Sequence, residues 1–309
     1  WKYASGSIDD DLSLPGLNDG AITVEAKDLM DVTVINTTQF DLRGNSLVQT
    51  ITRYSNEDLT GLIETQSISN SPFDFHDRLT HSSIVTFNSL GEFVDRQEID
   101  YKTYDIYGNV QDQTISRYDS IDSLIDYRVI HNEYLDPQAA RRGNATHTTI
   151  SRYTSNTILD STTKIERQEI YNQSFDTRGN IVDQTIELYV TVSGAEYLSR
   201  VTIIHNSNIS NSGDAYSQTI KTLVTDESGI NQLEVSYQEL TNRAFDSDHN
   251  VKNQTILNYL DSSKAILLDV QEVRNELFDS RGNVLEQRIA TYSGLLTDPT
   301  TVLLDVKVI

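Results

Sequence analysis

The feature that most constrains the fold is a repeated stretch, of which Phe175 to Tyr189 is the clearest copy. Its first residue, here called the anchor, recurs every 31 to 40 residues along the chain. A period of this size predicts a repeat architecture, in which one repeat cannot bury its apolar face alone. The eight anchors are Phe40, Phe73, Tyr104, Leu135, Phe175, Ile209, Phe245 and Phe278.

Two aliphatic columns accompany the anchors. Five residues before each anchor the residue is Ile35, Ile68, Ile99, Ile130, Ile170, Ile204, Leu240 or Val273. Eleven residues after it, allowing a four-residue insertion in the Leu135 repeat, it is Ile51, Ile84, Ile115, Ile150, Ile186, Ile220, Ile256 or Ile289. We expect this second column to form the buried core of the array.

The residues after each anchor predict a hairpin turn. Asp41–Asn45, Asp105–Asn109, Asp176–Asn180 and Asp279–Asn283 share an Asp-x-x-Gly-Asn pattern, which suits a type I turn followed by a left-handed residue. Where Gly is missing, Asp77 and His249 take its place, and both residue types tolerate the left-handed region better than most. The turn therefore reverses the chain within each repeat.

The flanking residues read as strands. Leu47, Gln49 and Ile51 alternate with Val48, Thr50, Thr52 and Tyr54, a period of two rich in strand-forming types. The prediction is an all-β fold, an array of about eight β-hairpin repeats in an extended or curling antiparallel sheet. The alternative is a parallel β-solenoid with one coil per repeat, against which the reversing turn is the main argument.

The repeat also sets the expected domain organisation. Residues 1–20 depart from it and are expected to form a junction or loop, and residues 21–309 one continuous array. The insertion Pro137–Arg142 in the fourth repeat is expected to bulge from the surface. Leu303–Ile309 mirrors Leu267–Val273, so a ninth repeat is truncated at 309 and we expect the chain to be a segment of a longer repeat polypeptide.

The amino-acid composition argues against several classes of binding partner. The net charge of −22 makes nucleic acid an unfavourable partner, because binding phosphate needs clustered Lys and Arg, and it opposes docking on anionic lipid. The chain contains no Cys, which excludes disulfides and thiol catalysis. Apolar runs fall short of the ~20 residues of a membrane helix, and neither strand face is uniformly apolar, so no membrane insertion is expected.

Motifs for catalysis or metal binding are weak. Asp246–Asn250 resembles the start of a calcium loop, but Val251 and Leu257 replace its required Gly and Glu, so turn chemistry is expected there. Asp9–Asp11 is expected to be a solvated acidic loop. The His residues show no zinc spacing: His76, His81, His131, His147, His205 and His249. We expect no catalytic, cofactor-binding or metal-binding residue, and no enzyme.

Two further columns are polar or aromatic. A column of Gln residues shares a face with the Ile column: Gln49, Gln113, Gln184, Gln218, Gln254 and Gln287. These side chains could form a ligand-binding stripe, but we expect them to be hydrogen-bonded within the sheet. Tyr54, Tyr118, Tyr153, Tyr189, Tyr259 and Tyr292 end the second strand and are expected to pack there rather than stack on sugars. The glycosylation-like triplets at Asn36, Asn144, Asn172, Asn208 and Asn253 are attributed to chance.

Tyr104–Asn109 has the Tyr-Asp-x-x-Gly-Asn form of the YD (Rhs-type) repeat, and Phe-Asp versions recur elsewhere. Over about residues 30–292 the chain resembles that family. The resemblance implies hairpins aligned in one long curling sheet, in large secreted or cell-surface proteins, some of which form shells around toxins. The expected function is a structural segment of such a protein, with neighbouring repeats of the same or identical chains as partners. The alternative is an adhesin that binds glycans or a partner cell surface.

Overall fold

The computed structural model describes residues 2–3, 29–56, 58–226, 228, 230–246, 248–278 and 282–309. Most of the expected junction at residues 1–20, including the Asp9–Asp11 loop, lies outside these residues. The described chain divides into two compact units. The larger comprises Thr33–Val201 and Thr225–Asn231, and the smaller comprises Trp1–Val32, Thr202–Val224 and Gln232–Ile309.

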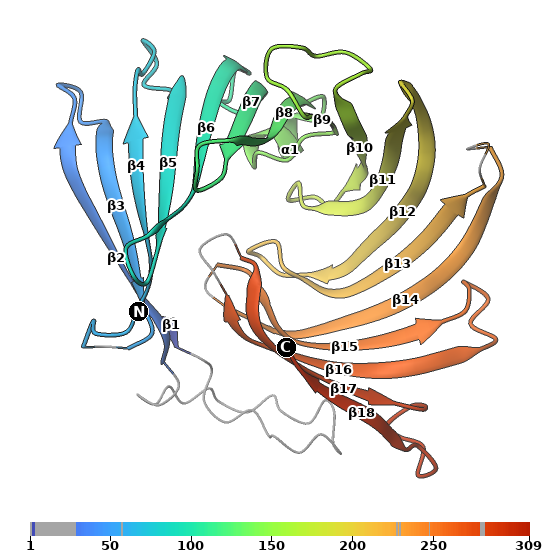
Figure 1. The fold of residues 1–309 in the computed structure, drawn as a ribbon. Helices are drawn as coiled ribbons and strands as arrows, with labels where there is room; N and C mark the ends of the chain where they lie inside the picture. The colour runs from blue at the N-terminus through green and yellow to red at the C-terminus, as the bar shows by residue number, and fades with distance from the viewer. Residues whose placement is uncertain are drawn as a thin grey trace. The chain divides into compact units, whose positions relative to one another are not determined.

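The described residues are nearly all in strands and turns, and the expected all-β class is confirmed (Figure 1). The first nine strands are β1 (Lys2–Tyr3), β2 (Leu29–Phe40), β3 (Ser46–Tyr54), β4 (Leu62–Asn70), β5 (His81–Asn88), β6 (Phe93–Tyr104), β7 (Val110–Tyr118), β8 (Leu124–Glu133) and β9 (His147–Tyr153). The rest are β10 (Lys164–Phe175), β11 (Ile181–Val192), β12 (Ala195–Ile209), β13 (Ala215–Thr225), β14 (Gln232–Phe245), β15 (Val251–Tyr259), β16 (Leu267–Phe278), β17 (Val284–Tyr292) and β18 (Leu303–Val308). Within the described part of the chain, one short helix, α1 (Pro137–Arg141), interrupts them.

Consecutive strands pair antiparallel. In the larger unit each strand from β3 to β11 pairs with the next, and in the smaller unit the same holds from β14 to β18. This meander confirms the hairpin prediction over the parallel solenoid, whose strands would pair in the same direction.

The register explains the two aliphatic columns. Within a hairpin the two columns face each other directly across the strands. The pairs are Ile68–Ile84, Ile99–Ile115, Ile130–Ile150, Ile170–Ile186, Leu240–Ile256 and Val273–Ile289. Toward the next hairpin the same Ile faces a polar or charged residue, as in Ile51–Gln66, Ile84–Gln97 and Ile150–Gln168.

The expectation that the second Ile column is the buried core is wrong. All eight of these Ile residues are only half-buried. In the smaller unit the tightest apolar cluster instead lies on the opposite face, where Val270, Ala290 and Tyr292 are 2%, 4% and 9% exposed. Side chains within one sheet are covered by neighbours on adjacent strands, and a Tyr ring covers more of its neighbours than an Ile side chain does.

The turns take the predicted conformation. Gly44, Gly108 and Gly179 have φ of 90°, 89° and 84°, and the substitutes Asp77 and His249 have φ of 61° and 66°. At the turn of the fifth repeat, the Gly179 amide donates to the Asp176 carbonyl at 2.9 Å. Asp176 Oδ1 accepts from the backbone amides of Arg178 and Asn180 at 2.8 and 2.9 Å. The side chain that opens the turn therefore replaces missing backbone partners.

The sequence predicted that the insertion in the fourth repeat bulges from the surface. This prediction is wrong. The insertion forms α1, capped by Asp136, whose carboxylate accepts from the amides of Gln138 and Ala139. Ala139 and Ala140 are 0% and 1% exposed. The helix packs between neighbouring turns, because Asn109 Nδ2 donates to the Ala140 carbonyl at 2.6 Å and a Cβ on Gly179 would lie 2.8 Å from the Gln138 carbonyl oxygen.

Candidate functional site

Five of the six Gln residues of the column are hydrogen-bonded inside the sheet, as predicted: Gln49, Gln184, Gln218, Gln254 and Gln287. Gln184 Nε2 donates to Asn172 Oδ1 on the paired strand at 2.7 Å, and Gln254 donates to Asn242 at 2.6 Å. The same bond recurs as Gln218–Asn206, Gln287–Asn275, Ser82–Asn70 and Thr148–Asn132. We call this hydrogen-bonded pair the Asn–Gln clasp. Its Asn lies two residues after the aliphatic residue of the first strand, and its partner, Gln in most repeats, lies on the second strand.

Five of the six clasps also reach the preceding hairpin. Asn172 Nδ2 donates to the Ala145 carbonyl at 2.7 Å, and Asn242 Nδ2 to the Ala215 carbonyl at 2.8 Å. Asn70, Asn132 and Asn275 donate in the same way to Ser46, Val110 and Val251. The Asn172 side chain therefore ties β10 and β11 to the segment that leads into β9, next to the bulge at which regular pairing is interrupted between Asn172 and Ser174.

Sequence reasoning missed the Asn half of the clasp. Its signal was present, because Asn occupies this position in six repeats: Asn70, Asn132, Asn172, Asn206, Asn242 and Asn275. Tyr101 replaces it in the third repeat and Thr37 in the first, where Gln49 Nε2 donates to Thr37 Oγ1 at 3.1 Å. Asn172 and Asn253, two of the glycosylation-like sites, are 8% and 5% exposed.

The Tyr column packs at the strand ends, as predicted, and cations cover several of its rings. The Arg96 guanidinium lies 4.6 Å from the Tyr118 ring centroid, and that of Arg167 lies 4.1 Å from the Tyr189 centroid. Lys164 lies 5.6 Å from the Tyr153 centroid. These cation–π contacts come from the neighbouring first strand, which the sequence pattern did not reveal.

In the calcium-like loop Asp246–Asn250, the Asp246 carboxylate accepts hydrogen bonds from its own turn, as predicted. Asp246 Oδ1 accepts from the amides of Asp248 and Asn250, each at 2.9 Å, and Oδ2 accepts from the Asn250 side chain at 2.9 Å. Among the described residues, no group of three or more His, Asp or Glu is arranged to hold a metal ion. Nor does the described part contain a helix long and apolar enough to cross a membrane.

Four His residues lie against carboxylates on different strands and turns. His81 contacts Glu98 and Asp100 at 3.2 and 2.7 Å, and His131 contacts Asp112 at 2.7 Å. His249 contacts Asp214 at 2.7 Å, and His147 contacts Glu169 at 2.8 Å. These residues are not brought together into one site, and each serves its own part of the sheet.

Glu169 lies in a cluster of titratable groups with His147 and Arg167. Burial raises its pKa, but hydrogen bonds from Thr149, His147 and Arg167 outweigh burial, and the pKa is lowered overall. A carboxylate held ionised by three donors is poorly suited to act as a general acid at neutral pH. This cluster therefore links β9 and β10 rather than presenting a reactive group.

Several buried charges of the described residues lie in ion pairs. Glu272 is 1% exposed and lies 2.8 Å from Arg243 and 3.2 Å from Arg274. Asp126, 2% exposed, lies 3.0 Å from Arg128. Such charges are expensive to bury without partners, and the pairing assigns them to the cohesion of the sheet.

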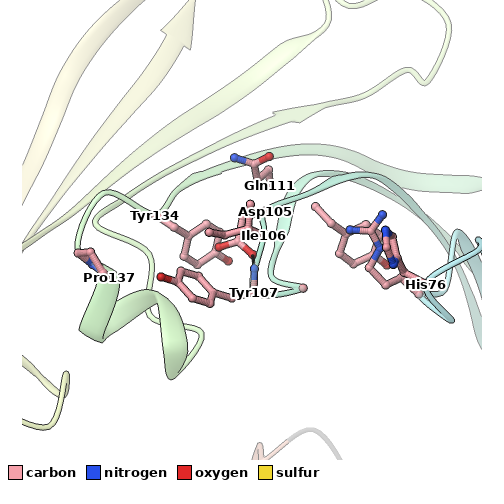
Figure 2. Close-up of a pocket in the computed structure, with 10 residues that line it drawn as sticks. His76, Asp105, Ile106, Tyr107, Gln111, Tyr134 and Pro137 are labelled. Atoms are coloured by element: carbon pink, nitrogen blue, oxygen red, sulfur yellow. Dashed lines mark hydrogen bonds between the residues drawn. The ribbon is translucent and has the colours of Figure 1, made fainter.

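A groove of about 930 Å³ lies at the turn ends of the second, third and fourth repeats, within the larger unit. Figure 2 shows side chains from two turns, the start of α1 and β7 around it. Its lining residues are His76, Arg78, Tyr104, Asp105, Ile106, Tyr107, Gly108, Gln111, Tyr134 and Pro137. Its volume is in the range of small-molecule pockets.

Most polar groups of the groove are committed to the fold. Arg78 Nη2 lies 2.7 Å from Asp74, and this hydrogen-bonded pair lowers the pKa of Asp74 to about 2. The Tyr134 hydroxyl donates to the Val110 carbonyl at 3.1 Å, and that of Tyr104 donates to the Leu79 carbonyl. Burial raises the pKa of both hydroxyls.

No protein-family model matches the chain, and no curated protein matches it. Among solved structures, the chain is weakly similar to one titled "Crystal Structure of TcdB2-TccC3", with a TM-score of 0.17 and 9% sequence identity. The match covers 89% of this chain and 19% of that chain, so the chain spans about a fifth of its length. A TM-score this low establishes neither a shared fold nor a shared function.

Proposed function

We propose that this chain is a structural repeat segment of a large secreted or cell-surface protein, such as a shell, fibre or stalk, and that it belongs with the YD (Rhs-type) repeats. The observation that carries the proposal is the Asn–Gln clasp. The polar side chains that recur from repeat to repeat hold neighbouring strands together, as Asn172 does with Gln184 and Ala145. Recurring polar groups that serve cohesion are what an array of structural repeats requires.

Further features support the same role. The Asp-x-x-Gly-Asn turns, exemplified by Tyr104–Asn109, carry the family likeness, and the hairpin meander agrees with it. The charge of −22 favours solubility and mutual repulsion over nucleic acid or anionic membrane. In this proposal the segment is not an enzyme, needs no cofactor, and has neighbouring repeats of the same or identical chains as its partners.

The test is a pair of Asn substitutions on first strands of the larger unit. Asn172→Ala removes the clasp and leaves the Gln184 amide and the Ala145 carbonyl without their partner. We expect a loss of about 1–3 kcal/mol in the free energy of unfolding, measured by urea denaturation. Asn36 is exposed, and Asn36→Ala should change stability by less than about 0.5 kcal/mol.

The competing role is an adhesin in which the Gln and Asn side chains contact a glycan. Under that role, Asn172→Ala would abolish binding while leaving the unfolding free energy unchanged. A stability loss no larger than that of Asn36→Ala would therefore contradict the structural proposal.

A further inference from the structure

The larger unit presents a row of exposed apolar side chains along one rim of its sheet. Because consecutive strands are antiparallel, the turns within the hairpins lie at one rim and the connections between hairpins lie at the other. We call these the turn rim and the opposite rim. The exposed side chains of the turn rim, here called the apolar row, are Leu42, Phe75, Ile106 and Leu135, at 107%, 82%, 91% and 76% exposed.

The apolar row belongs to the first half of the array. Leu42, Phe75 and Ile106 each stand two residues after the anchor, directly behind the Asp that opens the turn. At the same position the fifth to eighth repeats carry Thr177, Asn211, Ser247 and Ser280. The turn therefore accepts small polar residues there, and large apolar residues exposed in three successive turns need an explanation beyond the scaffold role.

Contacts between neighbouring turns hold the apolar row in place. Arg43 Nη1 in the first turn donates to the Asp74 carbonyl in the second at 2.8 Å. The Arg78 guanidinium of the second turn lies 4.7 Å from the Tyr104 ring centroid at the start of the third. Neighbouring tips are separated by two strand spacings, or about 10 Å. A row that is already ordered has little conformational entropy to lose on binding.

The two rims differ in charge, although both carry exposed aliphatic residues. On the opposite rim Leu90 and Ile121 are each 80% exposed. The sequences of the connections there contain six acidic residues and no Lys or Arg, in the ranges 55–61, 89–92, 119–123 and 154–163. The loops of the turn rim contain five Asp and four Arg, in the ranges 41–45, 71–80, 105–109 and 134–146. The turn rim is therefore nearly neutral and loses less hydration energy when its side chains leave water.

Arg141 and Tyr107 place groups suited to a bilayer surface beside the apolar row. Arg141 is exposed, its guanidinium lies 5.8 Å from the Tyr107 ring centroid, and among the described residues it forms no ion pair. Tyr107 is 42% exposed and directly follows Ile106. An Arg side chain can reach phosphate while its stem stays in an apolar layer, and Tyr is favoured where that layer meets water.

We propose that the turn rim docks on a zwitterionic phospholipid bilayer, with Leu42, Phe75 and Ile106 inserted below the headgroups. No strand or helix enters the lipid. Fluid acyl chains fill the gaps between tips about 10 Å apart, whereas a protein partner would need projections that match them. Anionic lipid is disfavoured, because the net charge of the chain is −22.

A second copy of the chain is the nearest competitor for the apolar row. Two turn rims packed against each other would bury the same side chains. Each copy carries a net charge of −22, however, and the resulting repulsion opposes their association. A zwitterionic bilayer carries no net charge, which makes it the favoured occupant.

Flotation with vesicles of pure phosphatidylcholine tests the proposal on the intact 309-residue chain. We expect the chain to float with the vesicles, and we expect Leu42→Ser and Ile106→Ser each to weaken partitioning about tenfold, or ~1.4 kcal/mol. Leu90→Ser and Ile121→Ser are the matched controls, because they remove the same residue types from the opposite rim, and they should partition like the unsubstituted chain. All four side chains are exposed, so the variants should keep the fold, which circular dichroism checks.

A fluorescent label measures whether the apolar row enters the lipid. The chain contains no Cys, so Ile106→Cys and Ile121→Cys each offer a single position for an environment-sensitive dye. With phosphatidylcholine vesicles, the emission should shift to shorter wavelength for Ile106→Cys and stay unchanged for Ile121→Cys.

Three outcomes overturn the proposal: no binding to phosphatidylcholine vesicles, binding only when phosphatidylserine is added to them, or equal losses in the variants of the two rims. A dimer that Leu42→Ser dissociates, in a chain that does not float with vesicles, would assign the apolar row to a second copy instead; sedimentation equilibrium detects it. Failure here leaves the scaffold role intact, since that role is decided by the stability of Asn172→Ala.

Discussion

Gly179→Ala offers the sharpest test of how the repeats contact one another, because a matched position separates two effects. Gly179 and Gly108 occupy the same place in their turns, with φ of 84° and 89°. A Cβ at Gly108 would meet nothing within 4 Å. A Cβ at Gly179 would lie 2.8 Å from the Gln138 carbonyl oxygen and 3.1 Å from the Ala139 nitrogen.

The expected magnitudes follow from these geometries. In both variants the left-handed backbone costs Ala about 1–2 kcal/mol, which the lower entropy of the unfolded chain offsets by about 0.4–1 kcal/mol. Gly108→Ala should therefore lose on the order of 1 kcal/mol. Gly179→Ala should lose a further ~1–3 kcal/mol, because the methyl group meets helix backbone that cannot rotate away.

Urea denaturation followed by far-UV circular dichroism measures both variants beside the unsubstituted chain. Equal losses for Gly108→Ala and Gly179→Ala would refute the packing of α1 against the turn of the fifth repeat. If neither variant loses stability, the left-handed turn itself is wrong, and with it the main reason for expecting hairpins from this sequence.

Three further predictions test other parts of the molecule. Ile186→Ala should lower the free energy of unfolding by roughly 1–3 kcal/mol in urea denaturation, near or below the lower end of the range for buried aliphatic side chains, because Ile186 is half-buried. A loss above ~4 kcal/mol would contradict this and show that Ile186 lies in a tightly packed core. The pKa of Asp176 is lowered to about 2, since hydrogen bonds from Asn180 and Arg178 outweigh burial, and that of Asp74 is lowered to about 2 by Arg78. Because these folded-state values lie below the unfolded value of about 3.9, both groups contribute stability above about pH 4 that is lost as pH falls toward 2, and Asp176→Asn should flatten this decline in urea midpoints. Pulling the chain by its ends should release lengths of about 10–14 nm per repeat, from ~3.3–3.6 Å per residue, whereas a single rupture of the whole chain would contradict independent repeats.

The hairpin turn was predictable because it is a local structure. The residues from Asp176 to Asn180 contain both the carboxylate that accepts the turn amides and the Gly that adopts positive φ, so their sequence is sufficient to specify the reversal. The same holds for His249, whose place in the pattern predicted a left-handed backbone, and its φ is 66°. Alternation along Leu47–Ile51 likewise predicted strand β3.

The groove and the clasp were less accessible. The Gln column was visible and its hydrogen bonding expected, but its partner Asn172 lies 12 residues earlier on another strand. Nothing local relates Tyr107 to Tyr134 and Pro137, which meet only because the third and fourth turns lie together. The sequence could mark these residues as departures from the repeat but could not place them around one groove.

The sequence by itself determined the period, the turns and the strand character of this protein, since each depends on residues within a few positions of one another. Only the tertiary structure decided which side chains are buried. Ile occurs at the position of Ile186 in every repeat, yet Ile186 is only half-buried. Glu272, by contrast, is 1% exposed and lies between Arg243 and Arg274. The physical reason is that burial within a sheet depends on the size and charge of neighbours on adjacent strands, and the register that selects those neighbours is a property of the folded chain.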